Sequence, residues 1–117
     1  MTVRAISFES SSLKTLTAVE ADVNRSNQHE LQGVNSLRDI FGTDRNTFNV
    51  NFSQRGSLLE CSAQLTWYDS RENNPNRPSE YRLYFQSNTV MDIAKAGDDL
   101  LIGVTRQGQI HCELISR

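Results

Sequence analysis

A strict two-residue alternation is the sequence feature that most constrains the fold of this chain. Between Leu58 and Tyr68, apolar residues occupy every second position and polar residues fill the positions between them. The apolar positions are Leu59, Cys61, Ala63, Leu65 and Trp67. Because successive side chains of a β-strand point to opposite faces, this pattern predicts a strand with one buried face.

Shorter alternating segments predict further strands. They lie at 48–52, 81–85, 100–104 and 110–114, and a less regular segment rich in Thr and Val covers 13–23. The turn at 106–109 contains a glycine that can adopt positive φ, so the last two strands are expected to form a hairpin.

Two short helices are expected between these strands. In the first, at 34–41, an apolar stripe ends at Gly42. The second, at 88–95, has Asn88 as a candidate N-cap and Gly97 just past its end. Strands and helices do not alternate in a βαβ rhythm, so we expect one mainly β domain over 1–117, a small mixed barrel with two short helices.

Charge and composition limit the functional classes. The net charge is −2 and the pI is about 5.6, which counts against a nucleic-acid-binding domain, although ten of the twelve basic residues are Arg. No apolar run approaches the ~20 residues of a membrane span, and no leader-like start is visible, so a cytoplasmic protein is expected. Cys61 and Cys112 are expected to be buried free thiols, with a disulfide as the alternative.

Two long polar segments interrupt the β pattern. The first arm, residues 22–34, and the second arm, residues 68–82, are dense in Arg, Asn and Ser. Arg can make two hydrogen bonds to a guanine edge and Asn two to an adenine edge. A hairpin loop usually has 2–5 residues, whereas the second connection has roughly ten. Both arms could read a duplex, and both could equally be solvated connections built from turn-forming residues.

Several motifs resemble a known family. The run His29–Val34 after an Asn/Ser-rich arm, the run Tyr68–Arg71, and the cluster Arg77, Glu80 and Arg82 resemble the N-terminal effector-DNA-binding domain of EcoRII-type restriction endonucleases. The closing strands also fit, so the resemblance spans roughly residues 13–115. It implies a DNA-binding pseudobarrel, an open mixed β-barrel of about seven strands, of the kind found in the B-three domain of plant transcription factors. In that fold, two arms clamp the duplex and read the major groove.

The resemblance also implies a set of DNA-binding residues. They are Arg25, Ser26, Asn27, Gln28 and His29 in the first arm, and Arg71, Asn73, Asn74, Asn76, Arg77, Glu80 and Arg82 in the second. Asn24 is added to the first arm because its side chain can also donate a hydrogen bond to a base or phosphate. The second arm lacks the family's lysines, carries three Asn and two Pro, and has a longer spacing from Arg77 to Arg82. The target base sequence therefore does not transfer.

Individual roles within this set follow from side-chain chemistry. Arg71 and Arg77 are the candidates for guanine, and one of the three asparagines is the candidate for adenine. Glu80 could accept a hydrogen bond from cytosine, or it could pair with Arg82 or Arg71. Arg25 and His29 would hold a base or a phosphate.

Catalysis is not expected of this chain. Only Lys14 and Lys95 could serve in a nuclease carboxylate–lysine cluster, and no nucleophile, phosphate-loop or zinc motif is present. We therefore expect no metal and no cofactor. The expected partners are double-stranded DNA and a nuclease domain or subunit of the same restriction-modification enzyme, for which this chain would be the effector or target-recognition domain.

Two other functions remain open. The chain could be a protein- or oligosaccharide-binding β-barrel with adaptable loops. It could also bind single strands by base stacking, but of its aromatic residues only Tyr68 and Tyr84 are expected to face outward.

Overall fold

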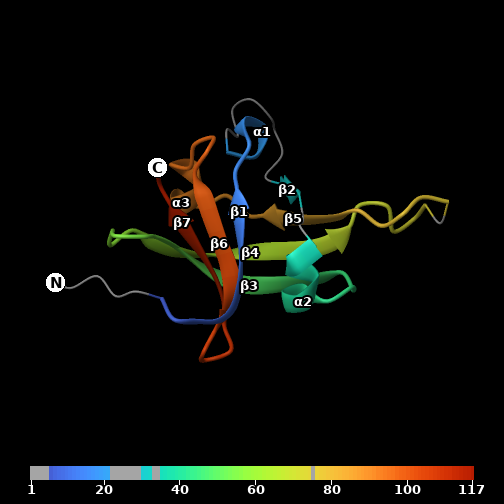
Figure 1. Cartoon of the computed structure of the whole chain (residues 1–117), viewed down its shortest axis with the longest axis horizontal. Coiled ribbons are helices and arrows are strands. Elements are labelled where there is room, and N and C mark those ends of the chain that lie inside the picture. The colour runs from blue at the N-terminus through green and yellow to red at the C-terminus, as the bar shows by residue number, and fades with distance from the viewer. Residues whose placement is uncertain (1–5, 22–29, 33–34, 75) are drawn as a thin grey trace.

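The computed structural model describes residues 6–21, 30–32, 35–74 and 76–117, and they form one curved seven-stranded sheet with short helices at its margins (Figure 1). The strands are β1 (Phe8–Thr15), β2 (Glu30–Gln32), β3 (Asn46–Gln54), β4 (Glu60–Asp69), β5 (Tyr81–Phe85), β6 (Asp99–Thr105) and β7 (Ile110–Ile115). The helices are α1 (Ala18–Ala21), the 3-10 turn η1 (Asn35–Leu37), α2 (Arg38–Phe41) and α3 (Thr89–Asp92).

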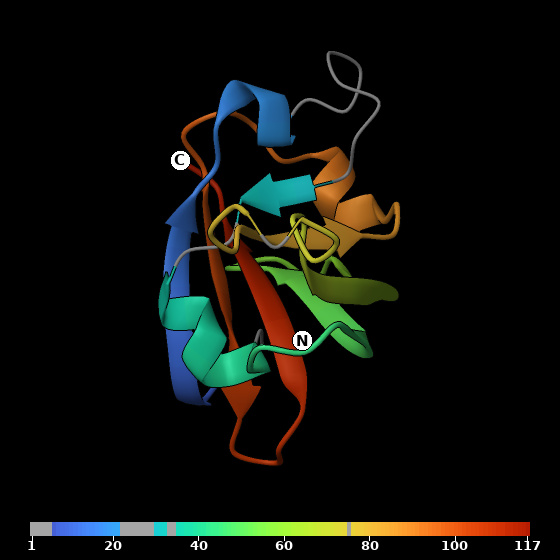
Figure 2. The same cartoon turned by 90° about the vertical axis from the view of Figure 1, so that its right-hand side faces the viewer.

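The sheet order is β1-β6-β7-β3-β4-β5-β2. Neighbouring strands are antiparallel except for β3 and β7, which are parallel. Figure 2 shows the sheet curling around its interior, with β1 on one side and β4 on the other. The predicted open, mixed β-barrel of about seven strands is confirmed.

The core lies on the concave face of this sheet. Trp67, Leu65 and Phe52 are at most 1% exposed and pack with Phe85 and Ile102 from neighbouring strands. On β4 the predicted core-face residues Ala63, Leu65 and Trp67 are buried and Cys61 is half-buried, whereas the residues of the other face are exposed or half-buried. The period-2 pattern therefore placed this strand correctly.

Residues 13–23 are not one strand, so that prediction is wrong. β1 ends at Thr15, and the helix α1 follows at Ala18–Ala21, which makes three short α-helices instead of two. Thr17 and Glu20 form a reciprocal cap, in which each side chain accepts a hydrogen bond from the other residue's backbone N–H. The spacing Thr-x-x-Glu is the sequence signal of this capping box, and it outweighed the β propensity of the segment.

Other element boundaries agree with the patterns more closely. Residues 35–41 form η1 and α2, which end at Gly42 with φ of 82°, and the Asn88 side chain caps α3 by accepting from the Met91 N–H at 2.9 Å. The hairpin between β6 and β7 turns at Gly108, whose φ is 82°. The short strand β2 was not predicted, because three residues carry too little periodicity.

The two cysteines are free. Phe52 on β3 is paired with Cys61 on one side and Cys112 on the other, so two strand spacings, about 10 Å, separate the thiols. That separation excludes a disulfide. Burial raises the pKa of the Cys112 thiol, so this cysteine is unreactive at neutral pH.

Candidate nucleic-acid interface

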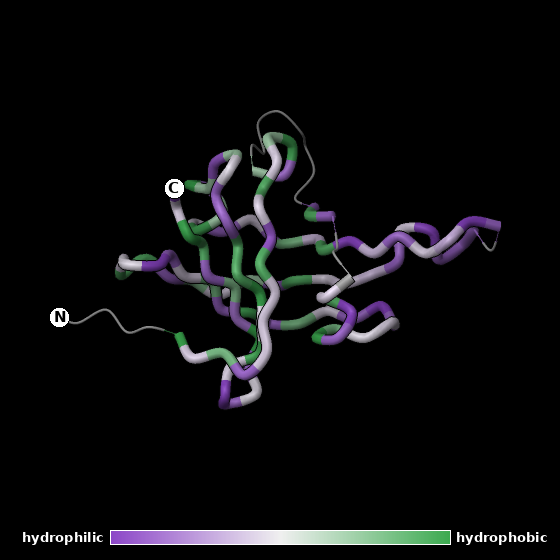
Figure 3. The backbone as a smooth tube through the Cα atoms, viewed as in Figure 1, coloured by the Kyte–Doolittle hydropathy of each residue, from purple (hydrophilic) through white to green (hydrophobic). Residues whose placement is uncertain are grey.

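The second arm projects beyond the barrel as an extension of β4 and β5 (Figure 1, right). Residues 70–74 and 76–80 form its projecting part, and they are mostly hydrophilic (Figure 3). A long polar extension at the end of a packed hairpin is suited to enter a groove on a partner.

Asp69 closes the base of the arm. Its Oδ1 atom accepts hydrogen bonds from the backbone N–H groups of Arg71 and Glu80, both at 2.9 Å. The N–H of Ser70 donates to the Glu80 carbonyl at 2.8 Å, directly across the stem. The hydrogen bonds from Glu80 and Arg71 hold the pKa of the Asp69 carboxyl below its ordinary value. The carboxylate is therefore charged at neutral pH and fixes the angle at which the arm leaves the sheet.

Successive turns give the rest of the arm local order. Backbone N–H groups of Glu72, Asn74 and Arg77 each donate to the carbonyl three residues earlier, at 2.9 to 3.2 Å. The Asn74 side chain accepts from the N–H of Asn76. These bonds give the arm a defined shape.

Glu80 holds two arginines at the stem. One of its carboxylate oxygens lies 2.7 Å from Arg71, and the other lies 2.9 Å from Arg82. Arg71 also donates to the Pro78 carbonyl at 3.4 Å. Of the two roles predicted for Glu80, the structure shows the ion pair. Glu80 pairs with both Arg71 and Arg82. A base contact by any of these three side chains would first have to break an ion pair.

The tip presents the remaining predicted residues to solvent. Asn73, Asn74, Asn76 and Arg77 are all exposed. Within the part of the chain that the structure describes, the Arg77 guanidinium has no hydrogen bond or ion pair. It is therefore the arginine of the second arm that is available to a ligand without rearrangement.

A stack of rings supports the stem from below. Tyr81 lies against Trp67 at 4.9 Å between ring centroids and 11° between planes, and Trp67 stacks in turn on Phe41. The guanidinium of Arg38 covers the far face of this stack, 4.4 Å from the Tyr81 centroid. Trp67 also donates from Nε1 to the Gly42 carbonyl at 2.9 Å, which ties the loop after α2 to β4.

Arg45 provides a second tie between that loop and the arm. Its guanidinium pairs with Glu72 at 2.6 Å and lies 4.8 Å from the centroid of the Tyr68 ring. Sequence reasoning found neither this contact nor the Arg38 stack, because both join residues that are far apart along the chain. Asp69 did have a local signal, since an aspartate often accepts the N–H two residues later in a turn.

The charges of the second arm balance. It contains three arginines and three carboxylates, those of Asp69, Glu72 and Glu80, so its formal charge is zero. Any DNA contact by this arm must therefore rest more on base edges than on net attraction to phosphate.

The predicted residues of the first arm, Asn24, Arg25, Ser26, Asn27, Gln28 and His29, lie outside the described residues. The strand that follows them, β2, pairs with β5, and the Tyr68 hydroxyl donates to the Glu30 carboxylate. Glu30 lies opposite Tyr84, and Gln32 lies opposite Arg82 at the stem of the second arm. β2 therefore runs toward that stem.

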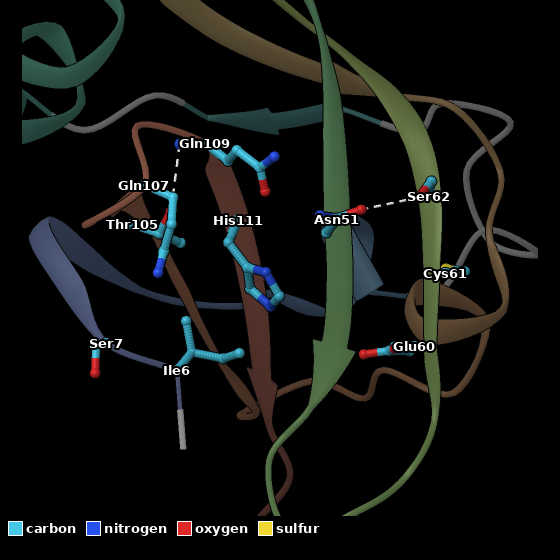
Figure 4. Close-up of a pocket in the computed structure, with 10 residues that line it drawn as sticks. All are labelled: Ile6, Ser7, Asn51, Glu60, Cys61, Ser62, Thr105, Gln107, Gln109 and His111. Atoms are coloured by element: carbon cyan, nitrogen blue, oxygen red, sulfur yellow. Dashed lines mark hydrogen bonds between the residues drawn. The ribbon is translucent and has the colours of Figure 1, made fainter. Parts of the chain in front are cut away.

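A separate hollow lies elsewhere, on the convex face of the sheet, and sequence reasoning missed it. It has a volume of about 510 Å³ and is bordered by His111, Asn51 and Glu60 (Figure 4). The His111 ring nitrogen Nε2 and the Ser53 hydroxyl are hydrogen-bonded at 2.7 Å. Burial lowers the pKa of His111, although the carboxylates of Glu113 and Glu60 act in the other direction, so this imidazole is neutral at pH 7.

Among the described residues, no three His, Cys, Asp or Glu side chains come together as metal ligands would. In the same part of the chain, no helix is long and apolar enough to cross a membrane.

Comparison with known proteins gives no relative: no family model, no curated protein and no solved structure matches this chain.

Proposed function

We propose that this chain binds double-stranded DNA by inserting the tip of the second arm into the major groove. The observation that carries the proposal is the combination of a fixed stem and a polar tip. Asp69 closes the stem with two hydrogen bonds of 2.9 Å, and the tip exposes Arg77 among three asparagines. The major groove is about 12 Å wide and admits a two-stranded ribbon of this kind.

Side-chain availability assigns the roles. Arg77 donates its two parallel N–H groups to guanine O6 and N7, and Asn73 or Asn76 pairs with adenine. Arg71 and Arg82 stay with Glu80 and stiffen the stem. Each bidentate contact contributes about 1–3 kcal/mol of discrimination against a wrong base. A locally ordered tip loses less conformational entropy on docking than a flexible loop does.

The resemblance to EcoRII-type effector domains extends the proposal to biological context. The chain would serve as the non-catalytic target-recognition or effector domain of a restriction endonuclease, with the nuclease in another domain or subunit. The open seven-stranded barrel is compatible with that role.

Selection of duplexes from a random pool, followed by band shifts, tests the proposal. Arg77→Ala should lose preference at one position of the selected sequence while weak binding to other duplexes survives. Arg106→Ala is the matched control, because Arg106 is an equally exposed arginine in the turn between β6 and β7, outside the arm. Equal weakening of all sequences by Arg77→Ala would assign Arg77 to a phosphate. Failure of the unaltered protein to prefer any duplex would end the proposal.

A protein partner is the competing assignment, and the balanced charge of the second arm favours it. Salt dependence separates the two. For DNA, the logarithm of the binding constant should fall with the logarithm of salt concentration by about one unit per phosphate contact. A protein partner recognised by uncharged contacts would show a slope near zero.

A further inference from the structure

The convex face of β3, β4 and β5 carries uncharged polar side chains in register. The cross-strand neighbours on this face are Thr47 with Thr66, Asn49 with Gln64, Asn51 with Ser62, and Thr66 with Tyr84. Amide and hydroxyl groups therefore stand side by side over three strands.

Three hollows on this face lie next to one another and share lining residues. The first, of about 510 Å³, shares Ser62 with the second, of about 350 Å³. The second shares Gln64 and Gln86 with the third, of about 390 Å³, which reaches Tyr84. We define the trough as these three hollows, which run along β4 from Glu60 to Thr66. Figure 4 shows its Glu60 end, where the Ser62 hydroxyl donates to the Asn51 side chain at 2.9 Å and Gln107 and Gln109 lie on the far side of His111.

The trough is almost free of charge. Among its described lining residues, Glu60 at one end carries the sole full charge, because His111 is neutral and no Lys or Arg contributes. A polyanion such as DNA finds no counter-charge here. The face is therefore unsuited to nucleic acid and to charged peptides.

Its chemistry matches a polyhydroxylated ligand. Each Asn or Gln side chain offers both donors and an acceptor, and each hydroxyl can do either, as can the hydroxyl groups of a sugar. The side chains of Asn49 and Gln64 are exposed and make no hydrogen bond to another described residue. At the other end, the Tyr84 ring is 46% exposed and offers an apolar face for the C–H side of a sugar ring.

The length of the trough sets the size of the ligand. From Glu60 to Thr66, β4 advances six residues, which at about 3.3 Å each gives about 20 Å, room for roughly four linked sugar rings. An extended peptide fits less well, because its backbone needs a regular row of backbone partners, and the strands of this face already use theirs in the sheet.

We propose that this trough is a binding site for a neutral, linear oligosaccharide of about four sugar units. The site is separate from the second arm and independent of the DNA-binding proposal. The central amides Asn49 and Gln64 provide paired hydrogen bonds, and Tyr84 stacks on a terminal ring.

Nuclear magnetic resonance titration of the ¹⁵N-labelled protein with four tetrasaccharides tests the site. The probes are cellotetraose, xylotetraose, maltotetraose and the tetramer of N-acetylglucosamine. At least one should shift the amide signals of residues 49, 62, 64, 84 and 86, with a dissociation constant of about 1 mM or tighter. The double variant Asn49→Ala/Gln64→Ala should weaken that binding about tenfold or more, because two exposed hydrogen-bonding side chains are lost.

The matched control is Asn73→Ala/Asn76→Ala, which removes two exposed amides from the tip of the arm and should leave sugar binding unchanged. The Asn73→Ala/Asn76→Ala variant should weaken duplex binding, whereas the Asn49→Ala/Gln64→Ala variant should leave duplex binding unchanged. Failure of one proposal is therefore distinguishable from failure of the other. Three results would overturn the oligosaccharide site: no shift with any tetrasaccharide, equal binding by the Asn49→Ala/Gln64→Ala variant, or tighter binding of an uncharged serine–asparagine peptide. Self-association of the protein through this face, measured by sedimentation and abolished by the same variant, would also overturn it.

Discussion

Replacement of Trp67 by phenylalanine tests whether the ring stack is the support of the arm. Trp67 is fully buried, stacks between Phe41 and Tyr81, and donates from Nε1 to the Gly42 carbonyl. Trp67→Phe keeps an aromatic ring in the stack but removes the N–H donor and part of the ring volume. The result should be a folded protein with a weakened junction between β4 and the loop after α2.

The loss in the free energy of unfolding caused by Trp67→Phe has three contributions. A volume loss of ~40 Å³ at about 24 cal/mol per Å³ costs about 1 kcal/mol as a cavity. The lost burial of the second ring costs about another 1 kcal/mol. The lost hydrogen bond adds about 0.5–1 kcal/mol, because Gly42 is exposed and water can replace the donor at its carbonyl. Together these contributions lower the free energy of unfolding by about 2.5–3 kcal/mol.

Urea unfolding followed by far-ultraviolet circular dichroism measures the change, since Trp67 is the sole tryptophan and its fluorescence is lost in the variant. With an m-value of about 2 kcal/mol per M, the midpoint should fall by roughly 1 M or slightly more. Leu58→Ala is the control, because Leu58 is 61% exposed and its truncation should change stability by less than about 0.5 kcal/mol. If Trp67→Phe costs no more than Leu58→Ala, the stack does not support the junction.

Three further changes test the packing and the electrostatics. Lys14→Met should lower stability by about 3 kcal/mol at pH 7, measured by urea unfolding, because it leaves the buried carboxylate of Glu20 without its cation at 2.9 Å. Burial raises the pKa of Glu20, but its hydrogen bonds and Lys14 lower it by more, so the net pKa lies below its ordinary value of 4.5. The loss of stability in the variant should therefore shrink as the pH falls below about 4.5 and the carboxylate becomes protonated. Gly103→Ala should cost about 2 kcal/mol or more in the same assay, since a Cβ would collide with the Ser10 carbonyl oxygen and lie 2.8 Å from the Phe8 ring, where β1 pairs with β6; a cost near zero would show that β1 can shift aside. Because the pKa of His111 is lowered in the folded state, stability should decline as the pH falls from about 6.5, and His111→Gln should remove that part of the pH dependence; an identical pH profile for the two proteins would contradict it.

The local patterns predicted much of the fold because strand periodicity and caps act over a few residues. The alternation over Leu58–Tyr68 placed β4 and its buried face, and Asn88 marked the start of α3. At residues 13–23 two local signals compete. The Thr and Val content favours a strand, but the Thr17–Glu20 capping box is the stronger signal and starts a helix.

The amino-acid sequence by itself therefore determined a mainly β chain, its principal strands, and the presence of a polar arm between β4 and β5. The tertiary structure decided which arm residues remain available: Arg71 and Arg82 engage Glu80, whereas Arg77 stays exposed. It also created the trough, by setting Asn51 on β3 between Ser62 of β4 and His111 of β7. Such contacts join residues tens of positions apart, so they follow from strand order and register, which no short stretch of sequence encodes.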